Sequence, residues 1–285
     1  MSAPIVRTLS ELGSRIDAWK AEGEIIGVVP TMGALHDGHL SLVTAAKAQC
    51  DRVIVTLFVN PRQFNNPDDF AKYPRTEAAD AELLGPLLVD ALFVPDAAEV
   101  YPSSHTTIVS VGGISAPLEG VHRPGHFDGV ATVVALLLNM TRADRAYFGQ
   151  KDWQQLQLVR RMVNDLKMPV EIAACPSVRD ADGLALSSRN LRLSPQARRL
   201  AAALPATLFA ASSQIEAGEP TEPVLAAART RLAEAGLGPL EYLELRDAET
   251  LGEPRPGHPA RLLVAIWLDG VRLIDNVGVG LREAG

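Results

Sequence analysis

Two histidines separated by two residues stand in the segment VVPTMGALHDGHLSLV, residues 28–43. The segment begins as a β-branched run, passes two glycines and continues with the period of a helix. The first turn of such a helix binds anions, because its N–H groups are unpaired and its dipole is positive there. His36 and His39 can face one side of this turn and donate hydrogen bonds to phosphate oxygens. The pattern predicts a phosphate site, with a solvated turn or a zinc site completed by His122 and His126 as alternatives.

Three further polar clusters each follow a predicted strand. They are Asn60 and Gln63 in FVNPRQF (58–64), Lys151 and Asp152 in YFGQKDWQQL (147–156), and Ser187, Ser188 and Arg189 in VRDADGLALSSRN (178–190). Amide side chains suit a small polar substrate, and hydroxyls with a lysine or a forked guanidinium suit phosphate. Each cluster alone also fits a turn, a helix cap or a solvated loop. Their shared position after strands predicts that they serve one site.

The elements that position these clusters alternate between strand and helix from residue 25 to residue 175. Strands are predicted near 25–29, 52–59, 91–94, 145–149 and 170–175, and helices near 39–50, 76–88, 127–141 and 153–167. TTIVSV, residues 106–111, is expected to form a short edge or lid strand. The alternation predicts an α/β fold with a Rossmann-like parallel sheet flanked by helices. Ligands of such sheets bind beyond the carboxyl ends of the strands.

The last hundred residues have a different character. A helix is predicted to start at Ser194 and Pro195, and a second to end at Gly236. Three strands follow, the last two joined by a turn at Asp269 and Gly270. We therefore expect a Rossmann-like domain over 1–184 and a small α+β lid domain over 185–285.

Composition and charge exclude several classes of protein. The net charge of −7 and the pI near 5.4 argue against nucleic-acid or anionic-membrane partners, which require a basic surface. Cys50 and Cys175 are too few and too far apart for a disulfide framework, and are expected to be small buried residues. With no signal peptide or membrane-length apolar run, we expect a cytoplasmic protein. Neither G-x-G-x-x-G nor G-x-x-x-x-G-K-[ST] occurs, which disfavours a dinucleotide dehydrogenase or a P-loop enzyme.

Several long segments, in order, resemble those of the pantoate–β-alanine ligase family. They are PTMGALHDGHLSLV, FVNPRQF, YPRT, LEGVHRPGHFDGV, FGQKDWQQL and DGLALSSRN. The resemblance covers nearly the whole chain and is strongest over 28–192. The H-x-G-H and S-S-R elements are also similar to the paired signatures of class I aminoacyl-tRNA synthetases and related nucleotidylyl transferases, which use them on the phosphates of ATP.

The resemblance implies a two-step ligation that uses ATP as its Mg²⁺ complex. The carboxylate of pantoate attacks the α-phosphate to give pantoyl adenylate and pyrophosphate, and the amine of β-alanine then displaces AMP to form pantothenate. Catalysis would consist largely of positioning and charge stabilisation, with no covalent enzyme nucleophile. The family also implies a homodimer and places the ATP- and pantoate-binding residues mainly in 1–184.

The resemblance assigns roles to particular residues. At the phosphates or their transition state it places His36, His39, Lys151, Ser187, Ser188 and Arg189, of which His36, His39, Lys151 and Arg189 are the catalytic candidates. For pantoate it implies Gln63 and Gln155, with Asn60 and Arg123 as further candidates. The remaining ATP contacts are Met32 at the floor of the pocket, Gly149 and Asp152 at the ribose, and Val178 and Leu186 beside the adenine.

The chain departs from the family pattern at two positions. Gln150 stands where relatives commonly carry an acid, which removes any ionic role there. Relatives often carry a cluster of acids after YPRT, whereas the run here is EAADAE, which leaves Asp80 as the best match to a residue that binds hydrated magnesium.

Other functions fit parts of the pattern. A nucleotidylyl transferase of the H-x-G-H superfamily would adenylate a small acid and stop there. A zinc hydrolase would use the histidines as metal ligands, and a nucleotide sensor would bind ATP without turnover. The acidic balance disfavours a tRNA synthetase.

Overall fold

The computed structural model describes residues 2–65, 70–71 and 73–281. Its contacts divide the chain into two compact units, described separately below: Met1–Gln150 with Leu158–Pro176, and Lys151–Gln157 with Ser177–Gly285. Helix α8 (Trp153–Asp165) contributes residues to both. The domain boundary predicted between residues 184 and 185 stays a prediction.

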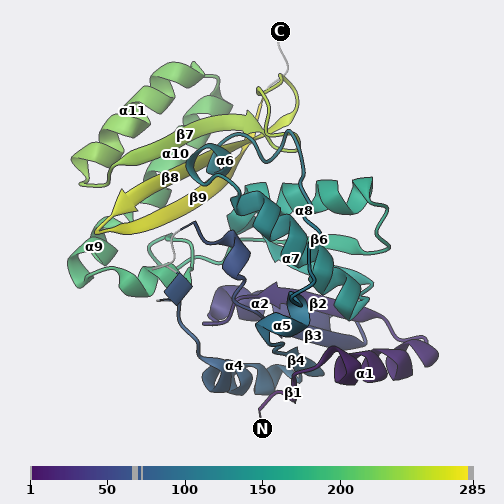
Figure 1. Cartoon of the computed structure of the whole chain (residues 1–285). Helices are drawn as coiled ribbons and strands as arrows, with labels where there is room; N and C mark the ends of the chain where they lie inside the picture. Colours follow the sequence, from purple (N-terminus) through teal and green to yellow (C-terminus); the bar gives the residue numbers. More distant parts are fainter. Residues whose placement is uncertain (1, 66–69, 72, 282–285) are drawn as a thin grey trace. The chain divides into compact units, whose positions relative to one another are not determined.

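The first unit is built on a parallel sheet with strand order β1-β4-β3-β2-β5-β6 (Figure 1). The strands are β1 (Ile5–Val6), β2 (Ile26–Thr31), β3 (Arg52–Leu57), β4 (Ala91–Phe93), β5 (Arg145–Gly149) and β6 (Glu171–Cys175). Starting from β2, the chain adds β3 and β4 on one side and β5 and β6 on the other. The strand order therefore switches sides between the parallel strands β2 and β5, and such a switch point is the place where open α/β sheets bind ligands.

Helices cover both faces of the sheet because consecutive strand residues, which point to opposite faces, are apolar. The helices named in this unit are α1 (Leu9–Ala21), α2 (Asp37–Lys47), α4 (Glu77–Leu84), α5 (Ala97–Val100), α6 (Glu119–His122), α7 (His126–Thr141) and part of α8, with the 3₁₀ turns η1 (Pro61–Gln63) and η2 (Gly85–Leu87) and the first residue of η3 (Gln150–Asp152). One apolar cluster joins Val29, Val53 and Val55 of the strands to Val43 of α2 and Leu84 of α4. Helices α1 and α7 pack against each other, and α7 also contacts β2. The predicted α/β class is confirmed.

Two details of the first sheet differ from the sequence prediction. Residues 106–111 form no strand, so the expected edge or lid strand was wrong. This segment runs along α7, where the Val109 N–H donates to Thr132 Oγ1 over 3.0 Å instead of to a neighbouring strand. The sixth strand is β1, whose two residues pair in parallel with Leu92 and Phe93.

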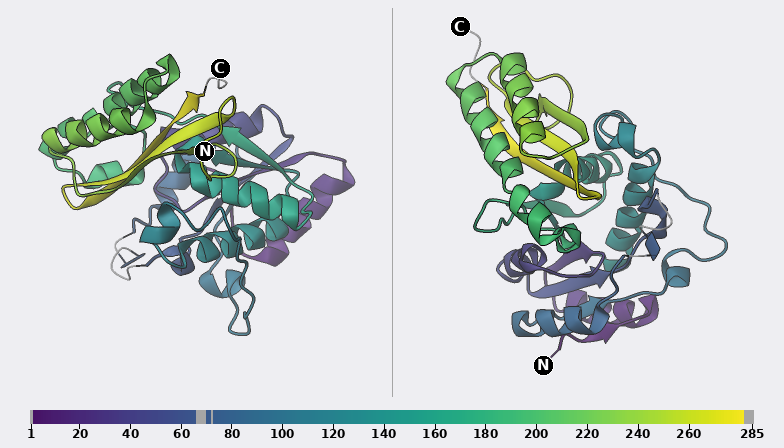
Figure 2. Two further views of the ribbon diagram at one scale, coloured as in Figure 1. Left: turned by 90° about the horizontal axis from the view of Figure 1, so that it is seen from above. Right: turned by 90° about the vertical axis from the view of Figure 1, so that its left-hand side faces the viewer.

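The second unit contains an antiparallel sheet of β7 (Leu240–Asp247), β8 (Pro259–Leu268) and β9 (Val271–Gly280). Its helical elements are η4 (Ser188–Arg192), α9 (Pro195–Leu200), α10 (Ala203–Ala217) and α11 (Thr221–Glu234). Helices α10 and α11 lie side by side, with α10 against β9 and α11 against β7 (Figures 1 and 2). The helix predicted from residue 194 is two helices, α9 and α10. Asp269 and Gly270 both have positive φ, as a tight hairpin turn of this hand requires.

Neither cysteine forms a disulfide. Cys50 and Cys175 are free and buried, as the sequence predicted, and burial raises the pKa of both thiols. Among the residues described by the structure, no helix is long and apolar enough to cross a membrane.

A buried carboxylate fixes the turn that follows β7. Asp247 is 1% exposed and accepts hydrogen bonds from the Glu249 and Thr250 N–H groups and from the Arg255 guanidinium, at 2.8–3.1 Å. Burial alone would raise the pKa of Asp247, but these donors outweigh it and lower the pKa to about 2. The charged carboxylate therefore stabilises the folded chain.

This arrangement predicts a pH-dependent contribution to stability. Because the folded pKa lies below the unfolded value of about 3.9, the contribution is present above about pH 4 and is lost as the pH falls toward 2. We expect Asp247→Asn to cost about 2 kcal/mol in the free energy of unfolding at neutral pH, and progressively less in acid. Denaturant titrations of both proteins at a series of pH values measure this, and a pH-independent difference would contradict it.

Candidate functional site

The first group of candidate residues lies in loops at the carboxyl ends of β2 and β3. Met32, His36 and His39 follow β2, and Asn60 and Gln63 follow β3. Gly149 ends β5, the strand on the other side of the switch point from β3. The parallel topology thus brings three of the predicted motifs of this unit to one edge of one sheet.

The two histidines form a reciprocal cap on helix α2. His36 is the N-cap residue, and its Nδ1 accepts a hydrogen bond from the Gly38 N–H over 3.1 Å. His39 Nδ1 accepts from the His36 N–H over 3.3 Å, and the two ring centroids lie 4.1 Å apart. This cap starts the helix at Asp37, two residues before the predicted position.

The cap also decides which ring nitrogen carries the proton. A ring nitrogen that accepts a hydrogen bond has no proton of its own, so the neutral imidazoles of His36 and His39 are protonated at Nε2. Both rings therefore offer an Nε2–H donor at the N-terminus of α2. Two such donors beside the positive end of a helix dipole can stabilise charge that develops on a phosphate.

The amide of Asn60 fixes the amide of Gln63. Asn60 is 1% exposed, and its Nδ2 donates to Gln63 Oε1 over 3.1 Å and to the Gly129 carbonyl over 3.0 Å. Its Oδ1 accepts from the Arg62 N–H over 3.2 Å and from the Tyr101 hydroxyl over 2.9 Å. Because Oε1 of Gln63 is taken, its Nε2 is the group turned toward Met32, whose Sδ lies 3.1 Å away. Gln63 can therefore donate to a carboxylate or hydroxyl.

The loop that carries Gln63 is held by the start of α7 and the residues just before it. The Gln63 carbonyl accepts from Arg123 Nη2 over 3.3 Å and lies 2.8 Å from His126 Nδ1. A Cβ at Gly129 would come within 2.3 Å of the Arg62 carbonyl, so only glycine permits this close approach. Arg123, predicted as a pantoate residue, and His126, considered as a zinc ligand, thus contact this backbone.

Asp80 lies on α4 rather than at the sheet edge. It is 1% exposed, and its two oxygens accept from the Ala34 N–H over 3.0 Å and the Leu35 N–H over 2.9 Å. The predicted contact of Asp80 with hydrated magnesium stays a prediction. Within the described residues, no three or more His, Cys, Asp or Glu side chains are grouped as metal ligands.

The second group of candidates belongs to the other unit and begins with the turn that precedes α8. Lys151 is largely buried, with its Nζ 3.7 Å from Asp152 Oδ1. Its carbonyl accepts from Asn276 Nδ2 over 2.8 Å. Gln155 lies on the first turn of α8, two residues after Trp153.

The three-stranded sheet holds this turn through side chains that the motifs did not reveal. Asn276 Oδ1 accepts from Arg261 Nε over 2.6 Å, and the Arg261 guanidinium lies 3.8 Å from the centroid of the Trp153 ring. Burial lowers the pKa of Arg261 to about 10, which still leaves it charged at neutral pH. Trp153 Nε1 donates to the Ala248 carbonyl over 2.8 Å. The sheet thus fixes the backbone on which Lys151 and Asp152 stand.

The segment from Val178 to Arg189 folds back on itself. The Leu186 N–H donates to the Val178 carbonyl over 3.0 Å, which brings the two predicted adenine neighbours together. Ser187 caps η4 by accepting from the Arg189 N–H over 3.3 Å, and Ser188 is the first residue of that turn. Within the described part of the chain, the buried Ser177 hydroxyl has no hydrogen-bond partner.

Arg179 anchors this segment to β9. It binds the Asp275 carboxylate with both Nη atoms, at 2.7 and 2.9 Å, and also donates to the carbonyls of Gly183 and Asn276. Asp275 is 2% exposed. No catalytic motif pointed to this pair, because its members lie far apart in the sequence.

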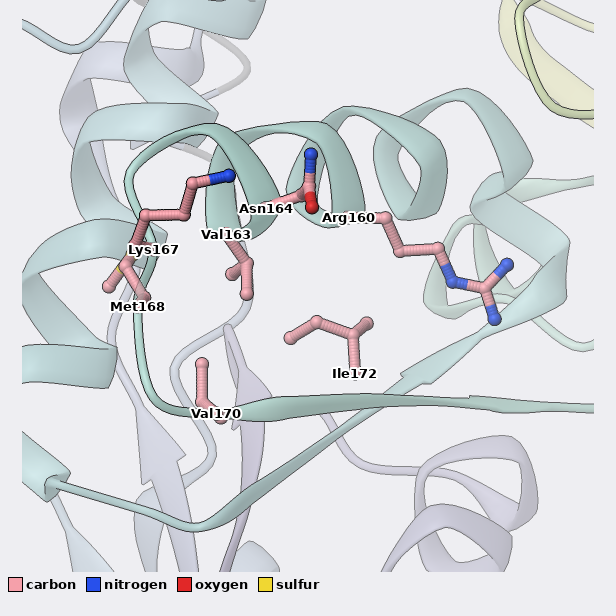
Figure 3. Close-up of a pocket in the computed structure, with 7 residues that line it drawn as sticks. All are labelled: Arg160, Val163, Asn164, Lys167, Met168, Val170 and Ile172. Atoms are coloured by element: carbon pink, nitrogen blue, oxygen red, sulfur yellow. The ribbon is translucent and has the colours of Figure 1, made fainter.

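A separate hollow of about 430 Å³ lies between the second half of α8 and β6 (Figure 3). Its lining combines apolar side chains with Arg160, Asn164 and Lys167. The three polar residues come from α8 and its C-terminal end, whereas Val170 and Ile172 lie on the β6 side. None of the predicted site residues lines this hollow, which is therefore distinct from the candidate site.

Comparison with known proteins gives a consistent family. The sequence profile of the family described as pantoate-β-alanine ligase matches residues 4–278. The pantothenate synthetase of Paracoccus denitrificans is 73% identical over 282 residues, covering 99% of this chain and 100% of that protein. The pantothenate synthetase of a Cereibacter sphaeroides strain is 60% identical over 277 residues, covering 97% and 99%.

Solved structures agree with this result. The crystal structure of pantothenate synthetase from Thermus thermophilus is 43% identical with a TM-score of 0.89, covering 96% of this chain and 98% of that one. Pantoate-β-alanine ligase from Francisella tularensis, complexed with β-γ ATP and β-alanine, is 34% identical with a TM-score of 0.82, covering 100% and 99%. With a family profile along nearly its whole length and relatives of this similarity, the chain belongs to the pantoate–β-alanine ligase family.

Proposed function

We propose that the chain condenses pantoate with β-alanine to form pantothenate, using ATP and releasing AMP and pyrophosphate. The family is one of amide-forming ligases that cleave ATP to AMP. The observation in this structure that supports the proposal most directly is the His36–His39 cap, which places two imidazoles at the N-terminus of the helix that follows β2, beside the switch point of the parallel sheet. Such a site suits a nucleotide phosphate.

The first step forms pantoyl adenylate. A carboxylate is a poor acyl donor, so its oxygen attacks the α-phosphate and pyrophosphate leaves. His36 and His39 donate to phosphate oxygens as negative charge develops, and the cations of Lys151 and Arg189, with the hydroxyls of Ser187 and Ser188, bind the phosphates. The rate then depends on alignment and electrostatics.

Pantoate is oriented by amide groups. The Nε2–H of Gln63, fixed by Asn60, donates to its carboxylate or hydroxyls, and Gln155 contributes a second amide. Met32 forms an apolar and backbone-lined floor beside Gln63. Asn60 and Arg123 both contact Gln63 and remain further candidates for pantoate in this proposal.

The remaining ATP contacts follow from the same proposal. Gly149 and Asp152 reach the ribose, while Val178 and Leu186 flank the adenine. A Cβ at Gly149 would meet open space, so the backbone there is accessible to a ligand. In the second step the amine of β-alanine attacks the acyl carbon, the amide bond forms and AMP leaves with the electrons of the acyl–phosphate bond.

Magnesium enters this proposal with the phosphates of ATP. Both oxygens of Asp80 are engaged by backbone N–H groups, and the described residues group no three or more acidic, histidine or cysteine ligands. No step proposed here depends on a protein-bound ion. We also propose a cytoplasmic homodimer, which sedimentation of the purified chain and fractionation of cells would test.

Release of pyrophosphate and AMP separates the ligase from a transferase that stops at the adenylate. With ATP, Mg²⁺ and pantoate, we expect the purified protein to release about one mole of pyrophosphate per mole of protein and then to stop. Addition of β-alanine is expected to start steady turnover with stoichiometric AMP and pantothenate. Steady pyrophosphate release that β-alanine leaves unchanged would indicate the transferase, and no response to pantoate would refute the substrate assignment.

A further inference from the structure

A buried carboxylate accepts hydrogen bonds from the backbone of the loop between β2 and α2. Asp80 Oδ2 accepts from the Ala34 N–H over 3.0 Å and from Thr76 Oγ1 over 3.0 Å, and Oδ1 accepts from the Leu35 N–H over 2.9 Å. Asp80 forms no ion pair with a described residue and is 1% exposed. Its charge is therefore balanced mainly by these N–H and O–H donors.

This loop has a conformation that its sequence does not favour. Ala34 has φ +52°, in the left-handed region that residues with a Cβ rarely adopt. Gly33 has φ +85°, and a Cβ there would lie 3.1 Å from Asp80 Oδ2. A strained backbone persists only where its surroundings impose it. Asp80 accepts from the N–H groups of Ala34 and Leu35, and Thr76 Oγ1, which itself donates to Asp80, accepts from Ala34 as well, over 3.2 Å.

We propose that Asp80 is a positioning residue for the adenylation step, which it serves by fixing Gly33–Leu35 and hence the placement of His36. The bound backbone N–H of Leu35 directly precedes the N-cap residue His36, whose N–H in turn orients His39. A shift of this turn moves both Nε2–H donors together. The inference rests on the proposed function, because the donors matter through the phosphates they bind.

Asp80→Asn tests the inference with little change in volume. Its amide can accept from only one of the two loop N–H groups and turns an NH₂ toward the other. We expect the rate of pantoate-dependent pyrophosphate exchange into ATP to fall by about 10–100-fold, because small misplacements of catalytic groups cost factors of this size. The KM for β-alanine, and the reaction of added pantoyl adenylate with β-alanine, are expected to change by less than about threefold.

A second substitution separates positioning from general damage. Ala34→Gly removes the left-handed strain, so in the Asp80→Asn background it is expected to restore part of the exchange rate. Asp247→Asn is the matched control, since it alters another buried aspartate that accepts backbone N–H bonds, in the other unit. It is expected to lower stability and leave the conformation of the His36–His39 cap unchanged.

Nitrogen NMR of ¹⁵N-histidine protein supplies a readout that needs no turnover. The chain has six histidines, and single variants of His36 and His39 assign their signals. We expect Asp80→Asn to move the Nδ1 and Nε2 signals of these two residues, and Asp247→Asn to leave them in place. If the wild-type protein shows no pantoate-dependent exchange, the proposed function fails, while these signals still test the contact of Asp80 with the loop.

Three results would overturn the inference. The first is an unchanged exchange rate in Asp80→Asn. The second is an equal loss in both half-reactions with unmoved histidine signals, which would make Asp80 a purely structural residue. The third is full recovery of the exchange rate at high Mg²⁺, which would make it a metal contact.

Discussion

We expect His36→Asn and His39→Gln each to lower pantoate-dependent pyrophosphate formation by about 10²–10³-fold while the fold stays intact. The reason is that the two nitrogens of each ring have different roles. Nδ1 accepts a backbone N–H and caps the helix, whereas Nε2–H is the donor that we propose for the phosphate. Asparagine is a good N-cap residue and glutamine a good partner at the third position of a capping box, so both variants retain the cap and lose the Nε2–H.

A second substitution at position 36 has the opposite effect, because it keeps a donor and weakens the helix cap. Glutamine places an amide donor near the position of Nε2 but caps the helix poorly. His36→Gln is therefore expected to retain more activity than His36→Asn and to lose about 1 kcal/mol of stability. Thr44→Ala, at an exposed site on α2, is the control for changes in the helix itself. Rates within tenfold of wild type in both His36→Asn and His39→Gln would remove these donors from the mechanism.

The sheet and its motif-bearing loops could be predicted from the sequence because their signals are local. A β-branched run, a glycine turn and a helical period each occupy a few consecutive residues, as in the stretch from Val28 to Val43. The order of such units along the chain then fixes which loops share an edge. Residues 106–111 were misassigned for the same reason: they are apolar and alternate like a strand, but a hydrogen bond to Thr132 on α7 replaces the strand partner.

The supports of the site could not be predicted because their partners are distant in sequence and are backbone groups. Asp80 appears as an acid after YPRT, and nothing local shows that it accepts from the N–H groups of Ala34 and Leu35. Asn276 lies in a β-branched strand sequence, yet it binds the carbonyl of Lys151. A motif records the side chains that meet a ligand, whereas contacts to backbone atoms place few constraints on the partner's residue type.

The second large effect concerns the anchor of the Val178–Arg189 segment. We expect Arg179→Met to lower the free energy of unfolding by about 3–5 kcal/mol, because it leaves the Asp275 carboxylate buried without its bidentate partner. Arg142→Met, which removes an arginine from the exposed pair with Asp17, is the matched control. Exposed pairs contribute about 0–1 kcal/mol, so the control should unfold close to wild type.

Removing both members of the buried pair distinguishes two causes of the lost stability. One is the loss of the attraction between Arg179 and Asp275, and the other is the cost of leaving Asp275 buried without a cation. If the penalty in Arg179→Met comes mainly from the unpaired Asp275, the double variant Arg179→Met, Asp275→Leu should regain most of the lost stability. Its ATP affinity should nevertheless stay low, because the carbonyls of Gly183 and Asn276 have lost the guanidinium that ties Val178 and its neighbours to β9. Equilibrium unfolding in denaturant and ATP titration followed by calorimetry measure the two quantities on the same proteins. A double variant that recovers both stability and ATP affinity would show that the Val178–Arg189 segment holds its conformation without Arg179. Recovery of stability alone would show that Arg179 contributes to ATP binding as well as to the stability of the fold.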